Sequence, residues 1–215
     1  MTSGLQDQIE LCPESPSATR ILLAGGAGIG VALLPAWIGW ASRQWRIQFK
    51  VVLSAKASTL VSSKALSVLT GSPVPSDGMQ DGSLERVLHI ELATWPDAVL
   101  VVPATADLIA RLAHGIADDL LTTVILATPR PTVLVPSIGG TALGKPAVRR
   151  NLAVLEGDGY GLVPMPNGLQ VSDGSISPGA MADAPTAFAY LWTFLRDSNS
   201  VGSAKVVPVR TAPLR

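Results

Sequence analysis

The chain has 215 residues, a formal net charge of zero, and 47% hydrophobic against 15% charged residues. This length is enough for one substantial α/β core. The balanced charge excludes the basic surface with which proteins bind nucleic acid or anionic membranes, so we expect neither partner. Few charges and many apolar residues favour a homo-oligomer, because obligate subunit interfaces resemble protein cores.

The cysteine and histidine content argues against metal binding. The single cysteine, Cys12, excludes an intramolecular disulfide framework and a cysteine-based metal cluster. His89 and His114 are the only histidines, which argues against a multi-histidine site. We therefore predict no metal, and we expect the protein in a reducing cytoplasm.

The uncharged stretch of residues 21–40 permits two interpretations. Its length and the G-x-x-x-G formed by Gly26 and Gly30 fit a transmembrane helix. Its glycines and Pro35 instead favour a short strand followed by an amphipathic helix, and residues 1–20 lack the basic segment of a signal peptide. We prefer the second interpretation and predict no membrane span.

Apolar runs and helical spacings predict the elements in chain order, between a flexible arm at 1–19 and a flexible tail at 198–215. Strands are expected at 21–24, 49–53, 98–102 (broken by Pro103) and 160–163, and further apolar runs lie at 124–127 and 132–135. Helices are expected from the glycine loop to about 45 and at 62–69, 145–155 and 188–195, and loops at 71–82 and 167–183. One more helix follows Pro103, with apolar residues at helical spacing: Leu108, Ile109, Leu112, Ile116 and Leu120. This alternation predicts an α/β fold with a doubly wound parallel sheet in a single domain, residues 20–197.

In such a sheet the loops after Ala24, Leu53, Val102 and Val135 open at the same carboxyl edge, where ligands bind. The first of these loops, G-G-A-G-I-G at 25–30, could cradle a phosphate with its backbone N–H groups. It is neither a Walker loop nor a clean G-x-G-x-x-G, and its glycines could equally serve close strand–helix packing.

Several polar residues near this edge have both a functional and a structural interpretation. Ser54, Ser58 and Thr59 could contact a phosphate or cap a helix. His89 is the best candidate for a general base by residue type, although single histidines are commonly structural. Asp118 and Asp119 are expected to cap a helix that begins at Leu120. We assign no role to His114.

Three motifs resemble the homo-oligomeric flavin-containing cysteine decarboxylases. They are H-I-E-L from His89, P-A-T-A from Pro103, and G-I-A-D-D-L-L-T-T from Gly115. The similarity is closest in type to the peptidyl-cysteine decarboxylases of lanthipeptide and linaridin biosynthesis, and it spans roughly residues 20–182. It implies a Rossmann-like, flavodoxin-like flavoprotein that forms trimers, or dodecamers built from trimers, with FMN (or FAD) bound between subunits.

The resemblance also implies the site residues and the reaction. The flavin oxidises the C-terminal cysteine of a precursor peptide, and decarboxylation then leaves an ene-thiol, with His89 and Asp107 as the catalytic residues. The implied flavin contacts are Gly26, Ala27, Gly28, Ile29, Ser54, Ser58, Thr59, Pro103, Ala104, Thr105, Ala106 and Asp107. The implied substrate contacts are Gly139, Ser175, Ile176, Ser177, Pro178 and Met181.

The chain departs from the family pattern at three places. Asp107 and Gly139 stand where the family has asparagines near the flavin and the substrate carboxylate. An ionised Asp107 would repel a carboxylate at 4 Å by ~4 kcal/mol at an effective dielectric of 20. The loop at 174–181 has no cysteine, whereas pantothenate-pathway members carry one there that reduces the ene-thiol. The loop without a cysteine favours decarboxylation of a peptide over decarboxylation of phosphopantothenoylcysteine. Asp107 and Gly139 leave open the alternative of a flavin-binding scaffold protein that has lost catalytic activity.

Overall fold

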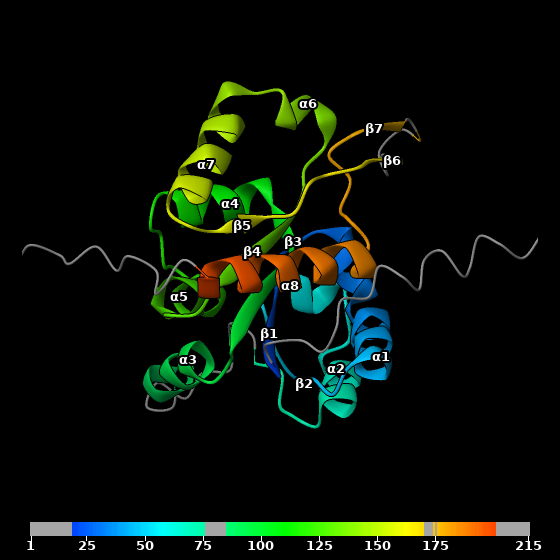
Figure 1. Cartoon of the computed structure of the whole chain (residues 1–215), viewed down its shortest axis with the longest axis vertical. Coiled ribbons are helices and arrows are strands. Elements are labelled where there is room, and N and C mark those ends of the chain that lie inside the picture. Colours follow the sequence, from blue (N-terminus) through cyan, green and yellow to red (C-terminus); the bar gives the residue numbers. More distant parts are fainter. Residues whose placement is uncertain (1–18, 76–84, 170–173, 175, 201–215) are drawn as a thin grey trace, which may run out of the picture.

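A computed structural model describes residues 19–75, 85–169, 174 and 176–200. Its main sheet has five strands in the order β2-β1-β3-β4-β5, and every neighbouring pair is parallel (Figure 1). This is the flavodoxin-like order, and it confirms the predicted doubly wound α/β domain.

The elements have the following bounds. The sheet strands are β1 (Arg20–Gly25), β2 (Gln48–Leu53), β3 (Ala98–Thr105), β4 (Thr132–Ser137) and β5 (Gly161–Leu162), and a separate hairpin consists of β6 (Asn167–Leu169) and β7 (Ile176–Pro178). The α-helices are α1 (Leu34–Gln44), α2 (Ser63–Thr70), α3 (Glu85–Thr94), α4 (Ala106–Ala113), α5 (Leu120–Ala127), α6 (Gly140–Leu143), α7 (Pro146–Gly157) and α8 (Ala184–Ser200). Two 3-10 helices, η1 (Ile29–Leu33) and η2 (Ala57–Thr59), follow β1 and β2.

Helices cover both faces of the sheet, which explains why its central strands are apolar except at their ends. One core joins α1, α2 and α8 to the sheet, and it includes a cluster of aromatic rings around Phe188. The other core joins α3, α4, α5 and α7 to the opposite face. In Figure 1, α1 and α2 lie to one side of β1, and α3 and α5 lie to the other.

The expectation that the third strand ends at Pro103 is wrong, since β3 continues to Thr105. Proline has no N–H for the sheet ladder, and the pairing of β3 with β4 shifts register between Val101 and Ala104. This irregularity accommodates Pro103, so that the strand carries Thr105 to the carboxyl edge.

The single helical spacing expected after Pro103 is divided between two helices. Helix α4 ends at Ala113, and Gly115 follows with φ +66, a left-handed conformation that favours glycine and ends helices. Ile116 is consequently exposed, and α5 begins only at Leu120. The apolar run at 124–127 belongs to α5, whereas the run at 132–135 forms β4.

Two expectations for the C-terminal third of the chain also change. The loop expected at 167–183 contains the β6–β7 hairpin, and α8 extends three residues past Asp197 to Ser200. Residues 1–18 of the expected arm, 201–215 of the expected tail, and Ser175 lie outside the described residues.

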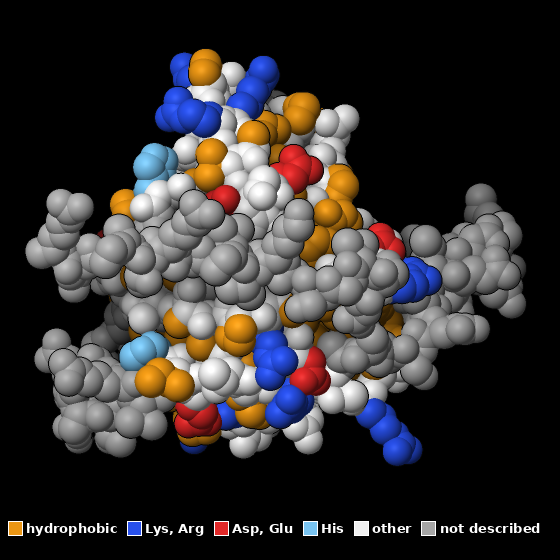
Figure 2. Space-filling view, turned by 60° about the vertical axis from the view of Figure 1, so that its left-hand side comes forward, with side chains coloured by type: hydrophobic (Ala, Val, Ile, Leu, Met, Phe, Trp, Pro, Cys, Tyr) orange, Lys and Arg blue, Asp and Glu red, His pale blue; other side chains and the backbone are white. Residues whose placement is uncertain are grey.

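The stretch weighed as a membrane span, residues 21–40, divides into β1, η1 and part of α1. Among the residues that the structure describes, no helix is both long and apolar enough to cross a bilayer. Isolated apolar side chains are exposed on several elements, including Ile29, Ile90 and Ile176. Figure 2 shows apolar, acidic and basic side chains interspersed over one face.

An ion pair secures the start of β1 to the turn before β3. Arg20 Nη2 donates to Asp97 Oδ1 at 2.7 Å, and the backbone N–H groups of Thr19 and Arg20 donate to Asp97 Oδ2. Burial alone would raise the pKa of Asp97, but these hydrogen bonds and the Arg20 charge lower it to about 2, against an ordinary value of 3.8. The stabilisation is therefore complete above the ordinary value and is lost as pH falls toward 2.

We expect Asp97→Asn to lower the free energy of unfolding by about 1 kcal/mol at neutral pH, a figure reduced for solvent screening because Arg20 is partly exposed. Urea unfolding of both proteins at a series of pH values measures this. The difference should shrink as the solution is acidified, and a difference independent of pH would contradict the assigned cause.

Candidate functional site

A pocket of about 360 Å³ opens at the carboxyl edge of the sheet, beyond the ends of β1, β2 and β3. This is the place where ligands bind in open α/β sheets, because the crossovers to either side of β1 leave a crevice there. Its volume lies within the range of small-molecule sites. The lining residues are Gly26, Ala27, Ser54, Ala55, Lys56, Thr105, Asp107, Leu108, Arg111, Asp118 and Asp119.

The glycine loop forms one wall of this pocket by packing against β3. A Cβ on Gly26 would lie 2.4 Å from the backbone oxygen of Pro103, and one on Gly28 would lie 3.1 Å from the Pro103 ring. The packing interpretation of these glycines is therefore confirmed. Gly26 is buried and Ala27 is exposed, and both line the pocket, so a ligand contact remains a prediction.

The second loop contributes Ser54 to the lining but not Ser58 or Thr59. Ser54 Oγ accepts from Ala57 N–H at 3.2 Å and thereby orders the turn into η2. Ser58 and Thr59 donate to backbone carbonyls three residues before them, at 2.7 Å each. All three hydroxyls thus have local structural partners.

The third wall is the first turn of α4. Thr105 caps this helix, its Oγ1 accepting from Leu108 N–H at 3.3 Å. Asp107, in the first turn, is 79% exposed and points a negative charge toward solvent at the pocket mouth. Pro103 and Ala104 are buried beneath this turn.

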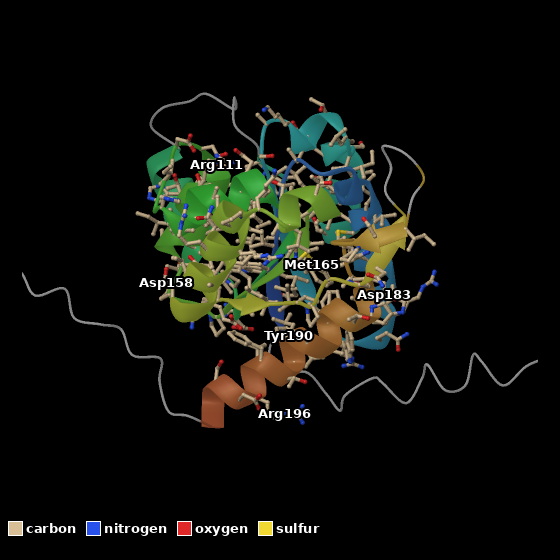
Figure 3. All side chains as sticks on the ribbon, turned by 90° about the horizontal axis from the view of Figure 1, so that it is seen from above. Arg111, Asp158, Met165, Asp183, Tyr190 and Arg196 are labelled. Atoms are coloured by element: carbon tan, nitrogen blue, oxygen red, sulfur yellow. The ribbon has the colours of Figure 1, made fainter. Side chains whose placement is uncertain are left out.

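Arg111 is the functional candidate that the sequence reasoning missed. It lies on α4, one helical turn after Asp107 (Figure 3). Its side chain is only 20% exposed and lines the pocket. Its Nη1 donates to Asp118 Oδ1 at 2.8 Å and to Asp119 Oδ2 at 2.7 Å, and its Nε lies 3.3 Å from Asp107 Oδ2. The i, i+4 spacing of Asp107 and Arg111 was the available signal.

The electrostatics of this cluster keep Arg111 charged. Burial would lower its pKa, but the hydrogen bonds to Asp119 and Asp118 and the nearby carboxylates raise it overall. Burial would also raise the pKa of Asp119, but hydrogen bonds from Thr122 and the Arg111 charge lower it. The cluster is therefore an ionised network with three carboxylates around one guanidinium.

The predicted capping role is confirmed for Asp119. Its Oδ1 accepts from the Thr122 backbone at 2.7 Å, and the Thr122 side chain completes a capping box at the start of α5. Asp118 is exposed and contacts Arg111 instead.

The two histidines lie outside the pocket lining. His89 is half-buried on α3, the helix that packs against α5. His114 is exposed at the end of α4, where its Nδ1 lies 2.8 Å from Ala110 O. The general-base role of His89 remains a prediction.

The predicted substrate segment forms a hairpin beside the loop that follows β4 (Figure 1). Ile138 N–H donates to Gly179 O at 2.9 Å, and Ser177 contacts Gly140. Met181 lies against Gly30, at 2.7 Å from its ideal Cβ position, whereas Ile176 is 77% exposed. Gly139, Ser177, Pro178 and Met181 thus adjoin the β4 and β1 loops, but none of them lines the pocket described above.

No group of three or more His, Cys, Asp and Glu side chains with metal-binding geometry occurs within the described ranges. The charged side chains that line the pocket are those of Lys56, Arg111, Asp107, Asp118 and Asp119.

Comparisons with known proteins agree with this geometry. The family model described as Flavoprotein matches residues 13–193. The bifunctional coenzyme A biosynthesis protein CoaBC of Escherichia coli K12 is 35% identical over 173 residues, which cover 80% of this chain and 42% of that protein. The chain therefore spans about two fifths of the length of this curated relative.

Solved structures include two FMN-dependent cysteine decarboxylases. SpaF is 30% identical with a TM-score of 0.65, and the match covers 84% of this chain and 97% of SpaF. TvaF, from thioviridamide biosynthesis, is 29% identical with a TM-score of 0.63 and coverage of 67% and 88%. MrsD from Bacillus sp. HIL-Y85/54728, at 21% identity and a TM-score of 0.69, shows the same fold.

Proposed function

The chain belongs to the Flavoprotein family, and from this premise we propose that it oxidatively decarboxylates the C-terminal cysteine of a ribosomally made precursor peptide. The observation that carries the proposal is the similarity to SpaF, an FMN-dependent cysteine decarboxylase, over nearly its whole length. The absence of a cysteine from residues 174–181 supports an ene-thiol product, because no thiol is present there to reduce it.

The residues of the pocket fit a flavin, FMN by the names of these neighbours and FAD as the alternative. Gly26 and Ala27 of the glycine loop line the pocket and would hold the phosphate with their backbone, and Lys56 would supply a positive charge. Ser54 and Thr105 offer hydroxyl oxygens on the other two walls. When bound, the flavin would supply the two-electron oxidation of the cysteine side chain that prepares the loss of carbon dioxide.

The protein groups around it have separate roles in the proposal. His89 would accept or donate a proton as the general base or acid of the reaction. Asp107 would be the second catalytic residue. The residues that would contact the peptide end are Gly139, Ser175, Ile176, Ser177, Pro178 and Met181. Because His89 lies outside the pocket of its own chain, we propose that a second copy in a trimer or dodecamer completes the site.

A second candidate is decarboxylation of phosphopantothenoylcysteine, which the similarity to CoaBC favours. A third is a flavin-binding scaffold without turnover, favoured by Asp107 and Gly139 in place of the family's asparagines.

One experiment separates the three candidates. The purified protein is examined for flavin absorbance and incubated with peptides ending in cysteine, and with phosphopantothenoylcysteine, while mass is followed. Loss of about 46 mass units from a peptide, carbon dioxide plus two hydrogens, is the expected result. Loss of about 44 from phosphopantothenoylcysteine alone, without net oxidation, would favour the second candidate. A yellow protein with no mass change would favour the scaffold, and a protein that takes up no flavin would contradict all three.

A further inference from the structure

The guanidinium of Arg111 has one N–H donor, at Nε, without a hydrogen-bond acceptor among the described residues. Nη1 is committed to Asp118 and Asp119. Nε is buried and makes no hydrogen bond within the described part of the chain, although Asp107 Oδ2 lies 3.3 Å away. An ion pair without a hydrogen bond leaves this donor available to a better-aligned oxyanion.

The three carboxylates around Arg111 differ in how firmly they are held. Asp119 is 16% exposed and also accepts hydrogen bonds from Thr122 N and Oγ1, so it is fixed. Asp118 and Asp107 are 61% and 79% exposed. Exposed ion pairs contribute about 1 kcal/mol or less, so Asp107 can turn to water at little cost.

We propose that Arg111 binds the carboxylate of the N-acyl cysteine substrate through its Nε edge, and that Asp107 holds this place in the ligand-free chain. The inference rests on the proposed function, and it applies equally to a peptide C-terminus and to phosphopantothenoylcysteine, because both present a carboxylate on an N-acyl cysteine. Arg111 would thereby replace the carboxylate recognition that the family's asparagines provide and that Asp107 and Gly139 cannot.

Arg111 suits this role better than Lys56, the other cation in the lining. Arginine presents a rigid fork of N–H groups that matches a carboxylate, whereas lysine is a flexible, strongly hydrated point charge. Arg111 is mostly buried and held by Asp119, whereas Lys56 is exposed. A donor held in place in this way loses less side-chain entropy when the ligand binds.

Binding of two matched probes tests the proposal without turnover. A tripeptide ending in S-methylcysteine, whose blocked sulfur prevents oxidation, is titrated calorimetrically as the free acid and as the C-terminal amide into the flavin-loaded protein. The wild type should bind the acid about tenfold more tightly than the amide. Arg111→Gln should reduce that preference to about twofold or less, whereas the matched control Arg130→Gln, at an exposed arginine outside the pocket lining, should change it by less than about threefold.

Asp107→Asn gives a second result that does not depend on the stability of the Arg111 variant. Removal of the competing charge at this exposed position should raise the preference for the acid over the amide by about threefold or more. Equal wild-type affinity for acid and amide overturns the proposal. So does a preference retained in Arg111→Gln, a preference lost equally in Arg130→Gln, or a preference that Asp107→Asn does not raise.

These results are distinguishable from those of the mass assay. Peptide turnover with an acid preference that ignores Arg111 would reject this inference and leave the proposed function standing. An acid preference that depends on Arg111, without any mass change, would support the carboxylate site and reject the proposed decarboxylation.

Discussion

Replacing His89 by glutamine is expected to lower the rate of decarboxylation by about 10²–10⁴-fold, the range by which a positioned general acid or base accelerates a reaction. Glutamine is similar in size and polar but cannot take up a proton near neutral pH. His89 is half-buried on α3 and outside the pocket lining, so flavin absorbance and the amount of bound flavin should stay at the wild-type level. Single-turnover mass analysis with a cysteine-terminated peptide measures the rate.

His114→Gln is the matched control, because it removes the chain's other histidine from an exposed position at the end of α4. It should retain the wild-type rate. A His89→Gln protein that turns over normally would remove His89 from the mechanism, and a rate loss shared by both variants would point to a general effect of the substitution.

Gly26→Ala is expected to destabilise the protein by about 3 kcal/mol and to abolish flavin binding. The added methyl would lie 2.4 Å from the backbone oxygen of Pro103 and 3.2 Å from Leu108 Cδ2. Backbone cannot yield as a flexible side chain does, so β1 and β3 must separate at the point where the pocket begins. Urea unfolding measures the stability, and flavin fluorescence measures the binding.

Gly39→Ala provides the control for this substitution. Gly39 lies inside α1, and nothing stands within 4 Å of the place where its Cβ would be. Alanine there should leave flavin binding unchanged and stabilise the protein by about 0.5–1 kcal/mol, because alanine favours helix over glycine. A Gly26→Ala protein as stable as wild type would mean that the β1 and β3 loops are less tightly packed than the structure shows.

The sequence by itself determined the class of the fold. The apolar runs of β1, β3 and β4 are buried on both faces, and such runs favour internal parallel strands, although the run at 124–127 belongs to α5. The cap at Asp119 was also predictable, because a capping box depends only on residues three apart. The glycine loop could be placed at the end of the first strand, but its packing against Pro103 could not.

Only the tertiary structure decided what surrounds Arg111. Asp118 and Asp119 reach it because Gly115 turns the chain back after α4, and no periodicity in the sequence reports the direction of such a turn. Pro103 remains in its strand because a register shift in the pairing with β4, a long-range feature, accommodates it. Local spacing thus determined the elements, whereas the charge at the pocket depends on contacts between residues that only the folded chain brings together.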